Sequence, residues 1–187
     1  RRNYISFLLA KKIICISHFV KNQIPRIFSS KKIVLYNYVE IFNKKIKLKR
    51  NHKILIKKNI NKKIIIFVSN IHKRKKPYSF LELMKKLVDK NKDYVGLMFF
   101  QSPKNEYLEV KKYIKKNKLG KSILLFNNLP THYWIPFVKK FRRKVMVATS
   151  KNEPLGRNLI ESALNKIFVI ANNSGGHKEI VSKNSGV

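Results

Sequence analysis

Two glutamates flank a predicted helix start and are spaced for ligand chemistry. Glu153 and Glu161 occur in SKNEPLGRNLIE, where Pro154 and Gly156 end an apolar run and open a helix. Backbone N–H groups at a helix start favour an anion, and a carboxylate accepts two hydrogen bonds from a vicinal diol. The segment predicts a site that holds a diphosphate between hydroxyl-bearing groups. The structural alternative is that Glu153 stabilises the helix dipole and Glu161 is a solvated helix acid.

A second loop with polar residues is NNSGGHKE, residues 172–179. Gly175 and Gly176 permit close backbone approach or a positive φ. His177 can donate a hydrogen bond to a phosphate or a sugar, and Glu179 can contact a ligand. The structural alternatives are a strand-to-helix turn, a partly exposed turn histidine and a helix-capping glutamate.

A third loop, NIHKRKK at residues 70–76, is strongly basic. Lys75 can neutralise phosphate charge as a point cation, or it can be one of several solvated lysines. The sequence contains no Cys/His spacing typical of a metal site, no P-loop, and no G-x-G-x-x-G after a strand. It therefore predicts no metal ion and no cofactor.

The elements that must position these loops follow from hydrophobic periodicity. Strands are predicted at 13–17, 32–37, 64–69, 94–100, 122–126, 145–149 and 167–171, and helices within 80–88, 105–116, 133–141 and 158–163. Strands that are apolar on both faces and alternate with helices indicate an α/β fold with a doubly wound, Rossmann-like parallel sheet. Ligands bind beyond the carboxyl ends of such strands, so the three loops are predicted to lie on one rim.

The chain is predicted to divide into three parts. Residues 1–42 carry two strand-like runs and are interpreted as the tail of an upstream domain. Residues 43–60 are charge-dense and weakly periodic, and are interpreted as a basic connector. Residues 61–187 are predicted to form the α/β domain. Because the chain opens on Arg1 and stops without a closing element, we expect a piece of a longer protein, incomplete at its C-terminus.

The net charge is +34, from 43 Lys and Arg against 9 Asp and Glu. One interpretation is a polyanion partner, either nucleic acid or an anionic membrane. The other is compositional drift, because the excess is nearly all Lys and accompanies Ile, Asn and Phe, which share A/T-rich codons. Nucleic-acid binders favour Arg, so drift is preferred and nucleic acid is not the expected partner.

The single cysteine and the short apolar runs bear on location. Cys15 lies in the apolar run IICI and is interpreted as a buried small hydrophobe in a reducing compartment. No apolar run approaches the roughly 18 residues that a membrane span needs. We expect a cytoplasmic protein, with peripheral contact to the inner face of an anionic membrane left open.

The stretch EPLGRNLIESALNKIFVIANNSGGHKEIV resembles the signature of group 1 retaining glycosyltransferases with the GT-B fold. In that family a Glu-x7-Glu motif precedes a buried strand and a Gly-Gly-x-x-Glu loop. Glu153 and Glu161 fill the first motif, and Gly175, Gly176 and Glu179 fill the second. Upstream, ICISHFVKNQI, KIVLYNYVE and FVSNIHKRKKP resemble the end of the family's N-terminal domain, the approach to its interdomain linker, and its phosphate-side loop.

The resemblance implies that Glu161 binds the ribose hydroxyls of a nucleotide diphosphate sugar and that Glu153 contacts the donor sugar. Lys75 would stabilise the diphosphate leaving group electrostatically. The other implied donor contacts are the backbone near Leu155 and Gly156, the Gly175-Gly176 loop, His177 and Glu179. The implied reaction transfers the sugar with retention, without a metal, to a sugar, polysaccharide or lipid acceptor.

The sequence also departs from the family. Ser69 and Asn70 stand where the family commonly has Gly and Arg, and losing that Arg removes a bidentate phosphate partner. Lys73 or Arg74 is the expected substitute. Nearly all of the N-terminal domain is absent, so the 187 residues alone are expected to be inactive. The alternatives are a polyanion-binding α/β module and a degenerate, inactive homologue.

Overall fold

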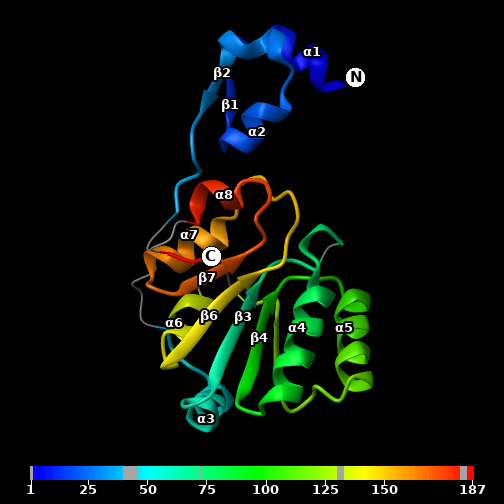
Figure 1. The fold of residues 1–187 in the computed structure, drawn as a ribbon, viewed down its shortest axis with the longest axis vertical. Coiled ribbons are helices and arrows are strands. Elements are labelled where there is room, and N and C mark those ends of the chain that lie inside the picture. Colours follow the sequence, from blue (N-terminus) through cyan, green and yellow to red (C-terminus); the bar gives the residue numbers. More distant parts are fainter. Residues whose placement is uncertain (1, 40–45, 72, 130–132, 182–184) are drawn as a thin grey trace.

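A five-stranded parallel sheet forms the centre of the protein in this computed structural model (Figure 1). The structure describes residues 2–39, 46–71, 73–129, 133–181 and 185–187. The strands are β3 (Lys63–Val68), β4 (Tyr94–Phe100), β5 (Ile123–Asn127), β6 (Arg143–Ala148) and β7 (Phe168–Ala171). Their order is β5-β4-β3-β6-β7, so the winding direction reverses between β3 and β6. In doubly wound sheets ligands bind at this reversal, outside the carboxyl ends of the strands.

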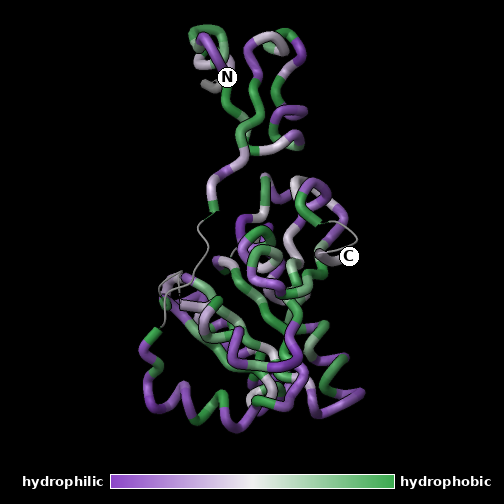
Figure 2. Tube along the Cα trace, turned by 90° about the vertical axis from the view of Figure 1, so that its left-hand side faces the viewer, coloured by the Kyte–Doolittle hydropathy of each residue, from purple (hydrophilic) through white to green (hydrophobic). Residues whose placement is uncertain are grey.

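Each central strand is buried on both faces because its residues alternate between two cores. In β3, Ile64 and Ile66 belong to one hydrophobic cluster, whereas Ile65 and Phe67 belong to the other. The second cluster is covered by α4 (Pro77–Lys90) and α5 (Lys104–Lys116), and the first by α3 (Arg50–Asn59), α6 (Trp134–Val138) and α7 (Arg157–Leu164). Figure 2 shows hydrophobic residues along the central strands and mixed residues along the helices. The predicted doubly wound α/β fold is confirmed.

Helix α3 was not predicted. It falls within the predicted connector 43–60, of which residues 43–45 lie outside the described part of the chain. Its last turns place Ile56 in the core, and the His52 ring contacts Phe126 and Phe137 at centroid distances of 5.7 and 5.6 Å. Residues 50–59 are therefore packed against the sheet, and lysines between the buried positions had hidden their periodicity.

Residues 2–39 form a small N-terminal unit beside the main domain (Figure 1). Its elements are α1 (Arg2–Leu9), β1 (Ile13–Cys15), α2 (His18–Gln23), the 3₁₀ helix η1 (Arg26–Lys31) and β2 (Lys32–Val34). Strands β1 and β2 pair in parallel. Cys15 is a free thiol, fully buried with Ile13 and Phe28, as predicted. Among the described helices, none has the length and apolarity that crossing a membrane requires.

Candidate functional site

A pocket of about 470 Å³ opens at the carboxyl ends of β3 and β4, beside the loop that follows β6. This volume lies in the range typical of small-molecule sites. The residues predicted for the site that line it are Lys75, Glu153, Leu155, Gly156 and Glu161. The position is the winding reversal of the sheet, so topology brings the loops after β3 and β6 to one cavity.

Lys75 and Glu153 form an ion pair inside this pocket. Lys75 Nζ lies 2.6 Å from Glu153 Oε2, and the two side chains are only 21% and 12% exposed. The Lys75 loop is held by Thr149 at the end of β6, whose hydroxyl donates to the carbonyls of Lys75 and Lys76 at 2.8 and 3.0 Å. The 3₁₀ helix η2 (Lys73–Lys75) is thereby fixed so that a cation and a carboxylate meet at the pocket wall.

The residues at the start of α7 line the pocket. Gly156 is the N-cap, with a left-handed φ of 94° that favours glycine, and the preceding Leu155 is 2% exposed. Asn158 Nδ2 donates to the carbonyl of Val68 at 2.7 Å, which ties the helix start to the end of β3. Arg157 and Asn158, in the first turn of α7, also line the cavity, and an anion is favoured at a helix start.

Glu161 faces the same pocket from the second turn of α7. Its side chain is 11% exposed, and Arg157 Nη2 lies 3.8 Å from its Oε1. Burial raises the pKa of the Glu161 carboxyl, although the nearby Arg157 charge and a hydrogen bond from the Trp134 side chain oppose the rise. Trp134 is 3% exposed and lines the pocket beside Glu161, so it orients this carboxylate.

Gly175, Gly176 and His177 lie behind the pocket and not in its lining. Gly175 has a φ of 65°, and a Cβ there would lie 2.6 Å from the carbonyl oxygen of Glu153. The Gly176 N–H donates to that oxygen at 2.7 Å. Their contact with a donor stays a prediction, because what the structure places here is close support of the Glu153 backbone.

His177 is 2% exposed and packs beneath Gly156, where an added Cβ would lie 3.0 Å from His177 Cδ2. Burial lowers the pKa of His177, against the opposing effect of a hydrogen bond to the Asn172 carbonyl. This shift favours the uncharged ring. The His177 ring packs against the start of α7.

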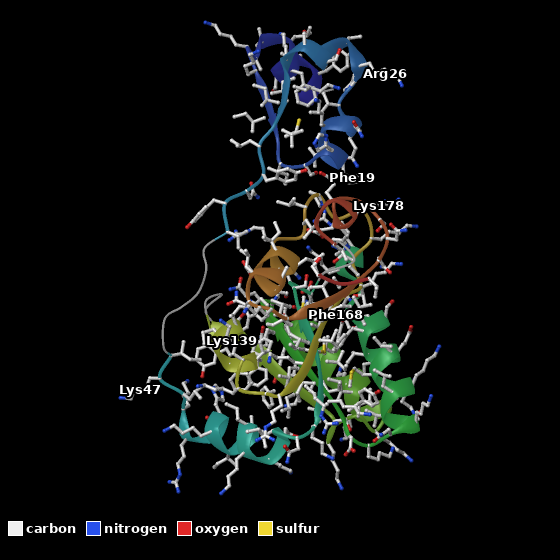
Figure 3. The ribbon with its side chains drawn as sticks, turned by 60° about the vertical axis from the view of Figure 1, so that its left-hand side comes forward. Phe19, Arg26, Lys47, Lys139, Phe168 and Lys178 are labelled. Atoms are coloured by element: carbon white, nitrogen blue, oxygen red, sulfur yellow. The ribbon has the colours of Figure 1, made fainter. Side chains whose placement is uncertain are left out.

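Glu179, in α8 (His177–Ile180), is turned toward the N-terminal unit. Its carboxylate accepts hydrogen bonds from the His18 and Phe19 amides at 2.8 and 2.7 Å and from the Tyr36 hydroxyl at 2.8 Å. Figure 3 labels Phe19 and Lys178 on the two sides of this junction. The contact of Glu179 with a donor stays a prediction.

The pocket contains a second cation that sequence reasoning missed. Arg157 and Lys75 are the basic residues in its lining as far as the structure describes it, and Asn70 lines it as well. Arg74, one expected substitute for the family's Arg, lines a smaller neighbouring pocket with Asn70. The side chain of Lys73, the other, lies outside the described part. Arg157 follows Gly156 directly, so its place on the helix start was the signal that was available.

Two further residues of the site were not singled out from the sequence. Trp134 was assigned only to a predicted helix, and Asn158 only to the helix that starts at the pocket. Their roles depend on contacts across 27 and 90 positions, with Glu161 and with Val68. Within the described ranges, His, Cys, Asp and Glu form no group of three or more that could hold a metal ion.

The fold is shared with several solved structures. A glycosyltransferase from Rickettsia africae ESF-5 matches with a TM-score of 0.71 and 24% identity, covering 94% of this chain and 48% of that one. HepE from Anabaena, in complex with UDP and glucose, matches with a TM-score of 0.75 and 17% identity, covering 96% and 49%. TarM matches with a TM-score of 0.73 and 18% identity, covering 99% and 35%.

The chain thus spans about half the length of the first two of these structures. A search of curated protein sequences finds no match. At the level of sequence families, residues 49–187 match the family described as glycosyl transferases group 1. That match covers most of the chain, including α3 and all three rim loops. The chain therefore belongs to the group 1 glycosyl transferases.

Proposed function

We propose that this chain supplies the donor site of a retaining glycosyltransferase, in which this pocket binds a nucleotide diphosphate sugar. The observation that carries the proposal is the placement of Lys75, Glu153 and Glu161 around one cavity at the start of α7. A cation and a helix start suit a diphosphate, and the two carboxylates suit the hydroxyls on either side of it.

Each group has one part in binding under this proposal. Glu161, oriented by Trp134, accepts hydrogen bonds from the ribose hydroxyls. Lys75, Arg157 and the first amides of α7 hold the diphosphate. Glu153 accepts from hydroxyls of the donor sugar, while its pairing with Lys75 keeps both side chains oriented before the donor arrives.

The same groups support the chemical step. When the bond between the anomeric carbon and the diphosphate oxygen breaks, its electron pair passes to the diphosphate, and the acceptor hydroxyl forms the new bond on the same face. The acceptor's proton leaves with the diphosphate. Lys75 and the helix start stabilise the developing negative charge, which is the contribution that fixed dipoles and cations make to such steps. No metal is needed in this scheme.

The acceptor lies outside the described pocket in this proposal. A sugar, polysaccharide or lipid-linked acceptor would bind on the side of the N-terminal unit, which contributes Ile16 and Asn37 to the lining. We propose that the 187 residues bind donor without transferring sugar. A cytoplasmic site of action agrees with the free, buried Cys15, and the basic surface agrees with peripheral contact to an anionic membrane.

Titration of the single tryptophan tests this proposal. The chain has one Trp, and Trp134 lines the pocket, so its fluorescence should report an occupied site directly. Because HepE is described with UDP and glucose, UDP-glucose is the first ligand, followed by GDP and ADP sugars. We expect a saturable change with a dissociation constant below about 1 mM for one of these bases.

The control is calorimetric titration of the wild type, which reports binding without the tryptophan signal. Trp134→Phe removes the hydrogen bond to Glu161, so calorimetry should report weaker binding in this variant. If no UDP, GDP or ADP sugar binds more tightly than millimolar by either method, the assignment of the pocket to a donor is wrong.

A further inference from the structure

The junction between the N-terminal unit and α8 is built around Glu179. Both carboxylate oxygens are used: Oε2 accepts from the His18 amide and the Tyr36 hydroxyl, and Oε1 accepts from the Phe19 amide. These donors lie more than 140 positions away in the chain. A carboxylate that accepts three hydrogen bonds is strongly oriented, and the pKa of Glu179 is lowered by those bonds even though partial burial opposes the effect.

A second contact joins the N-terminal unit to the main domain, at the loop that carries Glu153 and Pro154. Ser17 is fully buried, and its hydroxyl donates to the carbonyl of Pro154 at 2.5 Å while accepting from the Val20 amide at 3.1 Å. The first three amides of α2, those of His18, Phe19 and Val20, are therefore satisfied by Glu179 and Ser17 together. The turn from β1 into α2 therefore contacts the loop after β6, through Pro154, and helix α8, through Glu179.

Both contacts involve segments that are bonded or hydrogen-bonded to the backbone of Glu153. Pro154, held by Ser17, is the next residue, and the Glu153 carbonyl accepts from the Gly176 amide at the N-cap of the helix that carries Glu179. The N-terminal unit also completes the pocket wall through Ile16 and Asn37. The placement of this unit therefore determines the shape of the pocket around Glu153.

We infer that Glu179 is a positioning residue: it fastens the N-terminal unit to α8 and so sets the backbone of Glu153, and it does not bind the donor itself. We call the set of Ser17, Tyr36 and Glu179 the clasp. The role in donor binding rests on the proposed function above, whereas the fastening itself does not.

Amide exchange in the 187-residue chain tests the fastening without any ligand. In Glu179→Ala we expect the His18 and Phe19 amides to lose protection, and the Gly176 amide to lose protection through the loosened loop. The milder Tyr36→Phe, which removes one hydrogen bond, should reduce protection at the same amides. Amides of β3 should exchange as in the wild type, which separates loss of the clasp from unfolding. Glu82→Ala, an exposed glutamate on α4, is the matched control and should change none of them.

Donor affinity tests the consequence. We expect Glu179→Ala to weaken UDP-glucose binding about tenfold and Tyr36→Phe about threefold, with non-additive effects in the double variant because both remove one network. The inference is overturned if Glu179→Ala abolishes UDP-glucose binding but leaves the His18 and Phe19 amides protected, while Tyr36→Phe binds normally. Glu179 would then be a donor ligand. It is also overturned if Glu179→Ala leaves protection and affinity unchanged. If the wild type binds no nucleotide sugar, the proposed function fails, and the exchange pattern still decides whether the clasp exists.

Discussion

Gly176→Ala is expected to lower the affinity for a nucleotide sugar about 100-fold, because the Gly175-Gly176 loop can then no longer pack closely against the loop that carries Glu153 into the proposed donor pocket. Gly176 has a φ of −69°, so alanine suits its backbone. A Cβ at this position would lie 2.8 Å from the Cα of Leu155 and closer still to the Pro154 carbonyl oxygen. These are backbone atoms that cannot rotate away, so the loop that carries Glu153 must shift. Displacements of about 1 Å in an active site can cost on the order of 100-fold.

The same change should reduce the free energy of unfolding by about 1–3 kcal/mol, as overpacking of a tight contact does. Calorimetric titration and urea unfolding measure the two effects. Gly120→Ala is the matched control: a Cβ there meets no atom within 4 Å, so stability should change by less than about 0.5 kcal/mol. Wild-type affinity in Gly176→Ala would show that contact between these loops does not shape the donor site.

Glu161→Ala is expected to weaken binding of a nucleotide sugar by about 100-fold. Two hydrogen bonds from ribose hydroxyls to a buried carboxylate account for about 3 kcal/mol, which converts to this factor. Unchanged affinity for UDP-glucose in Glu161→Ala would remove Glu161 from the donor site.

Glu161→Gln separates binding from stability. Burial raises the pKa of Glu161 in the folded protein, so its ionised form opposes folding at neutral pH, and this cost is relieved as the pH falls through the folded-state pKa. The neutral glutamine should therefore fold at least as stably as the wild type at pH 7 while binding donor more weakly. A less stable Glu161→Gln protein would contradict this assignment of the cost to charge burial.

Below neutral pH, the affinity for UDP-glucose is expected to depend on the protonation of the Glu161 carboxylate. UDP-glucose keeps its diphosphate charge in mild acid, since both ends are esterified, so loss of affinity there reports the protein. Wild-type affinity should fall at a pH above that expected for an ordinary glutamate, as Glu161 becomes protonated. Glu161→Gln should show no such fall.

Much of the fold could be predicted because the strands are continuous apolar runs. In β3 and β4 nearly every residue is buried on one face or the other, and such runs indicate a parallel sheet covered on both sides. That sheet brings together Lys75, Glu153 and Glu161, which are up to 86 positions apart in the chain. The shared rim of these loops followed from topology, before any contact between side chains was known.

What the sequence could not indicate depends on long-range partners. Helix α3 reads as a basic connector because lysines lie between its few buried residues. Its burial depends on distant partners: Ile56 belongs to the core of the sheet, and His52 contacts Phe126 of β5 and Phe137 of α6. The family motif at Glu179 is equally compatible with a residue that binds the donor and with a residue that caps a helix. Its three donors belong to a segment whose placement no local pattern specifies.

The structure also bears on the departure from the family motif at Asn70. Asn70 lines the pocket without the charge of the family's Arg, but Arg157 enters the same cavity from the start of α7. Its side chain is 60% exposed and lies 3.8 Å from Glu161, so it can turn toward a diphosphate bound beside Glu161. A site with Lys75 and Arg157 retains two cations, which supports a working donor site over a degenerate one.

A crystal structure of the chain soaked with UDP-glucose tests the central claim most directly. The account predicts the ribose on Glu161 beside Trp134, the diphosphate at the first turn of α7 within reach of Lys75, and the glucose against Glu153, with Glu179 still bonded to His18 and Phe19. A nucleotide sugar bound elsewhere on the chain, with this pocket empty, would contradict it.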